Sequence, residues 1–132
     1  MSDKSKILYV DDEPINLQLF EMNFGQKYDV LLAESGHSGM RLLDDHQDTS
    51  VVISDMKMPE MNGLEFIKEA KAKYPNKNYL ILTGFDITDE LKDALRVGLI
   101  MKFLQKPFNI DQIEHEIEKY INWLYCDLTF LC

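Results

Sequence analysis

The sequence predicts a doubly wound α/β fold in which five parallel strands alternate with five helices. Short, continuous apolar runs recur along the 132 residues, as expected of strands that are buried on both faces. Segments with a helical spacing of apolar residues lie between these runs, and this alternation favours a parallel sheet with right-handed crossovers. The length fits one domain with a sizeable core.

Five apolar runs are predicted to form the strands. Each is four or five residues long, too short for a typical helix. The predicted strands are KILYV (6–10), DVLLA (29–33), VVIS (51–54), YLILT (79–83) and MKFLQ (101–105).

The first helix is predicted to begin at Pro14, because proline is favoured in the first helical turn. The apolar side chains expected on one side of it are Ile15, Leu19 and Met22, with Phe20 and Phe24 as further candidates.

Capping residues predict where the other four helices begin. The third helix should end before Pro75, and Gly98 should close the fourth. The expected caps are Ser35, Asn62 and Asn109, with Thr88 or Asp89 starting the fourth helix. The last helix carries Ile110, Ile113, Ile117, Ile121 and Leu124 at helical spacing.

Composition excludes several classes of function. The net charge is −9 and the pI about 4.7, which argues against a nucleic-acid surface because phosphate binding needs a basic patch. Both cysteines, Cys126 and Cys132, lie in the last seven residues, so no disulfide framework holds the core. No signal peptide or membrane span is visible. We expect a cytoplasmic protein that binds no membrane and no nucleic acid directly.

Polar residues follow the predicted strands where a site would form. In open α/β sheets, ligands bind at the carboxyl ends of the strands. The first strand runs into Asp11 and Asp12, the third into Asp55, the fourth ends at Thr83, and the fifth ends near Lys106. Three carboxylates, a hydroxyl and an ammonium group should therefore meet at one edge of the sheet.

A pair of acids aimed at a third carboxylate indicates a cation site rather than two acids that only cap a helix. Carboxylate oxygens suit Mg²⁺, which often shares its site with phosphate. A carboxylate beside Mg²⁺ and an ammonium group is a candidate nucleophile toward phosphorus, and Asp55 has that position. Glu13 should be more exposed, and its help in holding the ion stays open. Without Mg²⁺, repulsion among the acids should destabilise the domain.

Four motifs carry a resemblance to a known family. In order along the chain they are YVDDEPIN, VVISDMKMPEMNGLEFI, LILTGF and FLQKPF. Together they make the sequence resemble a response regulator receiver domain of two-component signalling, of the chemotaxis-Y-like kind, over roughly residues 5–122. The resemblance implies a flavodoxin-like strand order of 2-1-3-4-5. We expect a receiver domain at 1–124 and a C-terminal tail at 125–132.

The resemblance also implies roles for the site residues. Asp55 would be the phospho-accepting aspartate. Asp11 and Asp12 would hold Mg²⁺ together with Asp55. Thr83 would hydrogen-bond the phosphoryl group, and Lys106 would pair with it.

Three further positions match those that tune or transmit the signal in the family. The backbone carbonyl of Lys57 would be another Mg²⁺ ligand. Lys57 and Phe85 would flank the site and tune the lifetime of the phosphoryl group. Phe103 would be the switch aromatic residue.

The sequence departs from the family pattern in two places. Gly84 stands where the family often has alanine, which should loosen the loop after Thr83. The segment between Gly98 and Phe103 is one residue longer than usual and carries Leu99, Ile100 and Met101. This leaves the start of the last strand open.

The resemblance implies a protein that takes a phosphoryl group from a histidine kinase or phosphotransfer protein. It would catalyse its own phosphorylation and dephosphorylation, with no turnover of a separate substrate. The surface of the fourth helix, fifth strand and fifth helix would then change, and homodimers could form through that surface or through the apolar tail.

Two alternatives remain open at this point. One is a Mg²⁺-dependent phosphatase of the haloacid dehalogenase type, which needs a second aspartate where this chain has Lys57. The other is a pseudo-receiver that acts only as a protein-interaction module, although all five key positions are intact.

Overall fold

The structure, a computed structural model, describes residues 4–84, 87–107 and 109–121. The predicted tail at 125–132 lies outside the described residues, as do Leu124 and Phe85. The elements in chain order are β1 Lys6–Val10, α1 Pro14–Phe24, β2 Asp29–Ala33, α2 Gly36–Asp45, β3 Val51–Asp55, α3 Gly63–Lys73, β4 Asn78–Thr83, α4 Asp89–Arg96, β5 Lys102–Gln105 and α5 Ile110–Ile121.

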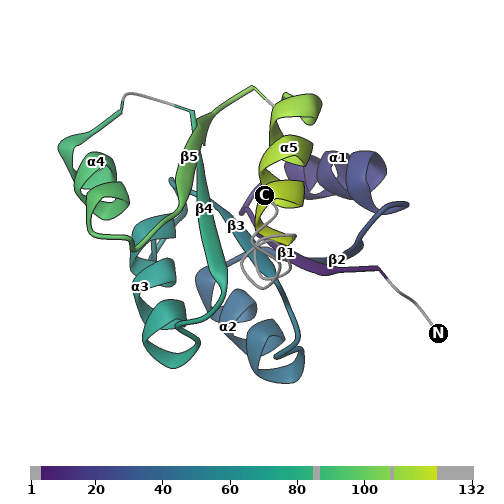
Figure 1. The fold of residues 1–132 in the computed structure, drawn as a ribbon, viewed down its shortest axis with the longest axis horizontal. Coiled ribbons are helices and arrows are strands. Elements are labelled where there is room, and N and C mark those ends of the chain that lie inside the picture. Colours follow the sequence, from purple (N-terminus) through teal and green to yellow (C-terminus); the bar gives the residue numbers. More distant parts are fainter. Residues whose placement is uncertain (1–3, 85–86, 108, 122–132) are drawn as a thin grey trace, which may run out of the picture.

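The five strands form one parallel sheet in the order β2-β1-β3-β4-β5, which confirms the predicted flavodoxin-like fold. Figure 1 shows three layers, with α1 and α5 on one face of the sheet and α2, α3 and α4 on the other. The chain reverses its winding at β1, which lies between β2 and β3. Such a switch point opens a crevice at the carboxyl ends of the strands.

Each face of the sheet has its own hydrophobic core. The alternation of side chains along β1 makes the division clear, because neighbouring residues point to opposite faces. Ile7 and Tyr9 pack with α1 and α5, whereas Leu8 and Val10 pack with α2, α3 and α4. All four are fully buried, so the central strand contributes to both cores.

The strands agree closely with the predicted runs. β1 and β2 have the predicted bounds, β3 extends one residue further to Asp55, and β4 begins one residue earlier, at Asn78. β5 begins at Lys102, one residue later than predicted. The additional apolar residues before it are used in packing, since Ile100 is buried and Leu99 packs against the same core.

The predicted caps are confirmed. Asn62 and Glu65 form a capping box at the start of α3, in which each side chain accepts a hydrogen bond of 2.9 Å from the other's backbone nitrogen. Gly98 follows α4 with a φ of 83°, a conformation that favours glycine. The side chains that cap α2, α4 and α5 are Ser35, Thr88 and Asn109.

The predicted core face of α1 is wrong for three residues. Phe20 and Phe24 are buried. The exposed side chains are Ile15, Leu19 and Met22, at 63%, 39% and 70% of their full accessibility. At 100° per residue, these three lie about half a turn away from the two phenylalanines. The aromatic face is buried because it offers more apolar area, and Phe20 stacks on the Tyr9 ring.

Among the described residues, no helix has the length and hydropathy of a transmembrane span.

Candidate functional site

The sheet register brings the predicted acids together. Val10 of β1 pairs with Ser54 of β3, so the residues that follow them, Asp11 and Asp55, leave adjacent strands at the same level. Asp11 is anchored by a 3.0 Å hydrogen bond from its backbone nitrogen to the Ala33 carbonyl of β2. The backbone of β1 and β3 therefore fixes both side chains at the switch point of the sheet.

Asp11, Asp12 and Asp55 form a cluster of carboxylates. One oxygen of each lies within 4.8 Å of the others, a spacing that could hold a metal ion. Asp11 and Asp55 are buried and Asp12 is half-buried. Glu13 is exposed and lies outside this group. Oxygen ligands from carboxylates suit a hard divalent cation.

Lys106 reaches this cluster from the end of β5. Its Nζ lies 3.1 Å from Asp55 Oδ1 and 3.5 Å from Asp11 Oδ2. Its backbone nitrogen donates a 2.8 Å hydrogen bond to the Thr83 carbonyl, which ties the residue to the end of β4. This ammonium group contacts two of the three carboxylates and so neutralises the acidic cluster only in part.

The electrostatics of Asp55 reflect this imbalance. Burial raises the pKa of Asp55 above its ordinary value, the hydrogen bond from Lys106 opposes the rise, and the charges of Asp11 and Asp12 add to it. Burial by itself lowers the pKa of Lys106, but its contacts with Asp55 and Asp11 outweigh this and raise it. The site therefore disfavours ionised Asp55 and favours an added positive charge.

A hollow of about 510 Å³ opens beside the acids. The buried Thr83 lines it from the end of β4, and Lys57 lines it from the loop after β3. The residues that sequence reasoning did not place there are Met56, Asn62, Thr88 and Leu91. The predicted hydroxyl, ammonium group and acceptor carboxylate thus border one space.

Phe103 does not line this space. Phe103 lies on β5, where its partly buried side chain packs against the core formed with α2, α3 and α4. Phe85 lies outside the described residues, so its predicted role stays a prediction.

Sequence reasoning missed the hydroxyl of Tyr9. It donates a 2.5 Å hydrogen bond to Asp11 Oδ2, inside the buried part of the site. Tyr9 belongs to a continuous apolar run and was therefore counted as a core residue. Its position two residues before Asp11, on the same face of an extended strand, could have indicated a hydrogen bond between the two side chains.

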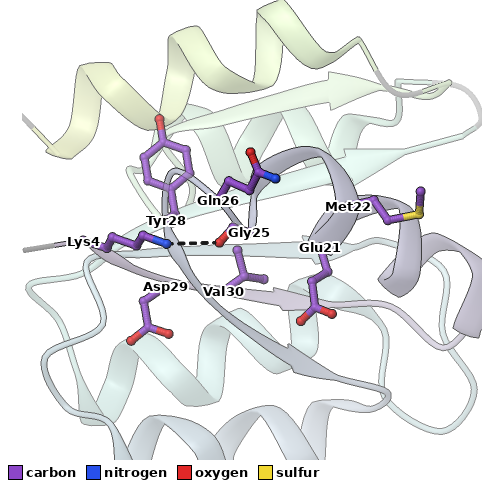
Figure 2. Close-up of a pocket in the computed structure, with 8 residues that line it drawn as sticks. All are labelled: Lys4, Glu21, Met22, Gly25, Gln26, Tyr28, Asp29 and Val30. Carbon is purple, nitrogen blue, oxygen red and sulfur yellow. Dashed lines mark hydrogen bonds between the residues drawn. The ribbon is translucent and has the colours of Figure 1, made fainter. Parts of the chain in front are cut away.

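A second hollow, of about 670 Å³, lies at the opposite end of the sheet (Figure 2). Figure 2 shows the Glu21 and Asp29 carboxylates on separate sides of it, with Lys4 Nζ directed at the Gly25 carbonyl. Both acids are exposed. This hollow therefore lacks the buried, converging charges of the first.

Comparison with known proteins assigns the chain to a family. The family model for the response regulator receiver domain matches residues 7–118. The chain is 31% identical to sporulation initiation phosphotransferase F of Bacillus subtilis over 117 residues, which cover 88% of this chain and 93% of that protein. It is 34% identical over 120 residues to the uncharacterized transcriptional regulatory protein YesN of the same organism, covering 88% of this chain and 32% of that protein. The chain spans about a third or less of the length of the first curated relatives.

Solved structures agree with this assignment. A response regulator receiver domain protein from Clostridium thermocellum superposes with a TM-score of 0.81 at 30% identity, over 92% of this chain and 97% of that one. The response regulator protein TrrA from Thermotoga maritima, in complex with Mg²⁺ and BeF, has a TM-score of 0.76 at 26% identity, over 88% of this chain and 98% of that one. The chain belongs to the response regulator receiver domain family of two-component signalling.

Proposed function

We propose that Asp55 accepts a phosphoryl group from a histidine kinase or a phosphotransfer protein in a reaction that depends on Mg²⁺. One observation carries the proposal. Three carboxylates converge at the ends of β1 and β3, and Lys106 Nζ lies 3.1 Å from the Asp55 carboxylate. Receiver domains accept phosphoryl groups from these donors, and this chain has the charges that such a transfer needs in one place.

The residues present fit Mg²⁺. Asp11, Asp12 and Asp55 offer oxygens, and we propose the backbone carbonyl of Lys57 as a further ligand. The ion would neutralise charge on the site and on the transferred group. The related TrrA protein forms a complex with Mg²⁺ and BeF, which supports the same ion here by family likeness.

The transfer itself is a displacement at phosphorus. An Asp55 carboxylate oxygen attacks the phosphorus of a phosphohistidine in line, the P–O bond forms, and the P–N bond breaks with its electrons returning to the imidazole. Lys106 supplies a positive point charge beside the attacking oxygen. Because the groups are held at the ends of two rigid strands, most of the catalysis is positioning and charge neutralisation.

Four further residues have proposed roles in the later steps. Water hydrolyses the resulting acyl phosphate, and we propose that Lys57 and Phe85 tune its lifetime. Thr83 would hydrogen-bond the phosphoryl group from the end of β4. Phe103, which is only partly buried, would then repack and shift the populations of the α4–β5–α5 surface.

Three apolar side chains on or beside α4 and α5 are exposed. Leu95, Val97 and Ile110 are exposed at 39%, 67% and 42%. We propose that the output acts through the α4–β5–α5 surface, on a target protein, on an output domain, or on a second copy of the chain. We also propose a cytoplasmic location, because the phosphodonors of two-component systems act there.

Neither alternative function is favoured. Lys57 stands where the phosphatase reading needs a second aspartate, and the family assignment supports the receiver reading instead. The pseudo-receiver reading needs a damaged site, whereas the acids and Lys106 lie in contact.

Labelling by acetyl phosphate tests the proposal. The wild-type protein should gain one phosphoryl group by intact-mass measurement with Mg²⁺ and none with EDTA, and Asp55→Asn should gain none. Asp29→Asn is the matched control, since Asp29 is an exposed acid at the opposite end of the sheet. Labelling of the Asp55→Asn variant at the wild-type rate would refute the assignment of Asp55.

A further inference from the structure

Asp11 is held by three donors in a fully buried setting. The backbone nitrogen of Glu13 donates to its Oδ1 at 3.0 Å. Its Oδ2 accepts hydrogen bonds from the Tyr9 hydroxyl at 2.5 Å and from Lys106 Nζ at 3.5 Å. A buried carboxylate needs such partners, because a buried charge that loses a hydrogen bond has no water to replace it. The Tyr9 contact is the shortest of the three.

The geometry of β1 explains why Tyr9 reaches this carboxylate. Residues two apart in an extended chain point to the same face of a sheet, so Asp11 follows Tyr9 on the side that α1 covers. A leucine or valine at position 9 would fill the core but would leave Oδ2 with the longer contact to Lys106.

The Tyr9 ring has little freedom to move. It is fully buried, and it stacks on Phe20 of α1 with centroids 4.3 Å apart and ring planes 10° apart. β1 is paired on both sides, with β2 and with β3. The hydroxyl is therefore a fixed donor, whereas the head of Lys106 ends a long, flexible chain.

We propose that Tyr9 is a positioning residue that orients Asp11 as a ligand for the divalent cation. This inference rests on the proposed function, in which Asp11 holds Mg²⁺. The hydroxyl acts through Asp11, to whose Oδ2 it donates a hydrogen bond. In the proposed reaction Lys106 turns to the phosphoryl group, so Tyr9 is the side chain that keeps Asp11 oriented in both states. Loss of an outer partner of a metal ligand typically weakens metal binding by about 10–100-fold.

Calorimetric titration with Mg²⁺ alone tests this inference. Tyr9→Phe removes one oxygen and keeps the ring, and we expect the dissociation constant for Mg²⁺ to rise by about tenfold. Tyr79→Phe is the matched control. Tyr79 is also buried on a central strand, but its hydroxyl donates to the Tyr74 carbonyl at 2.7 Å, away from the acids. Its Mg²⁺ affinity should equal that of the wild type.

A kinetic readout separates positioning from a general structural effect. For Tyr9→Phe, the Mg²⁺ concentration that gives half the maximal rate of labelling by acetyl phosphate should rise by a similar factor. The rate at saturating Mg²⁺ should stay close to that of the wild type, because Asp55 and Lys106 are intact.

A second variant covers the case in which Tyr9→Phe does not fold. Phe20→Leu removes the stacking partner and leaves the hydroxyl, so it should weaken Mg²⁺ binding by a smaller factor than loss of the hydroxyl itself. The inference would be overturned if Tyr9→Phe bound Mg²⁺ as tightly as the wild type, or if Tyr9→Phe and Tyr79→Phe lost the same affinity. If Tyr9→Phe cannot be measured, an unchanged Mg²⁺ affinity in Phe20→Leu would overturn it. Failure of the wild type to bind Mg²⁺ would instead remove the proposed metal site, and the inference with it.

Discussion

Each end of the sheet carries a hollow with acidic side chains, but the two ends differ in whether these acids are buried and whether they converge. At the carboxyl end, Asp11 and Asp55 are buried and converge on Lys106. At the amino end, Glu21 and Asp29 are exposed and do not converge (Figure 2). The amino-end hollow is the larger of the two, at about 670 Å³ against 510 Å³.

This difference teaches that buried, opposed charge marks a candidate site more clearly than the size of a hollow does. Solvated acids such as Glu21 and Asp29 cost the fold little, because water screens them. Buried acids that repel one another cost stability, so a fold that keeps them needs a compensating ion or a chemical use for them. The following predictions test this contrast between the two ends.

The largest effect should come from the lysines. Lys106→Met should lower the rate of labelling by acetyl phosphate by about 100-fold or more, because it removes the positive charge beside the proposed acceptor, Asp55. Lys4→Met, at the amino-end hollow, should leave that rate unchanged. Initial rates at saturating Mg²⁺ measure both. A Lys106→Met rate equal to that of Lys4→Met would remove the distinction between the two ends.

Packing around the site gives the next effect. A Cβ at Gly63 would lie 2.4 Å from the Asp55 carbonyl and 2.8 Å from Ile81 Cδ1. Gly63→Ala should therefore lower the free energy of unfolding by about 2–3 kcal/mol, as overpacking does. At Gly84 the nearest atom to a Cβ is Lys106 Cδ at 3.7 Å, so Gly84→Ala should raise stability by about 0.4–1 kcal/mol. Urea unfolding compares the two variants. Similar free energies of unfolding would show that the atoms around Gly63 move aside for a Cβ at little cost.

A smaller effect is expected in the pH dependence of stability. Because burial raises the pKa of Asp55 in the folded state, the folded protein binds more protons than the unfolded chain between the ordinary pKa of 3.8 and the raised value. The free energy of unfolding should therefore fall as pH rises through this window. Asp55→Asn should abolish that fall and stabilise the metal-free protein at neutral pH.

Urea unfolding in EDTA, from acidic to neutral pH, measures this difference. Asp29→Asn at the amino end should change the free energy of unfolding by less than about 0.5 kcal/mol at every pH. A stability gain that is the same in both variants, or a loss in Asp55→Asn, would contradict the account of buried repulsion.

The smallest effect concerns the exposed face of α1. Ile15→Gln and Met22→Gln should each change the free energy of unfolding by less than about 0.5 kcal/mol, because both side chains already meet water. Thermal unfolding checks this. A loss of more than about 2 kcal/mol in either variant, as for a buried apolar residue, would restore the face that the sequence predicted.

Much of the fold follows from local patterns. The bounds of β1 and β2 match their apolar runs, and the caps at Asn62 and Asn109 were visible because capping acts within one turn of helix. The convergence of the acids also followed from the sequence. The rule that ligands bind at the carboxyl ends of strands predicted that Asp11 and Asp55 would meet.

Features that depend on tertiary packing could not be predicted in the same way. α1 carries two apolar faces, and the choice between Met22 and Phe20 depended on the ring of Tyr9 beneath the helix. The start of β5 depended on Met101, whose backbone nitrogen bonds to Tyr79 of β4 although the strand begins only at Lys102. The role of the Tyr9 hydroxyl was hidden because the residue counts as apolar in a strand pattern.

The most direct test of the central claim is to locate the phosphoryl group. The protein is labelled with acetyl phosphate and Mg²⁺, reduced with sodium borohydride, which converts a phosphorylated aspartate to homoserine, and mapped by peptide mass spectrometry. The account predicts conversion at Asp55 and at no other acid. Conversion at Asp11 or Asp12, or at Asp29 of the amino end, would contradict it.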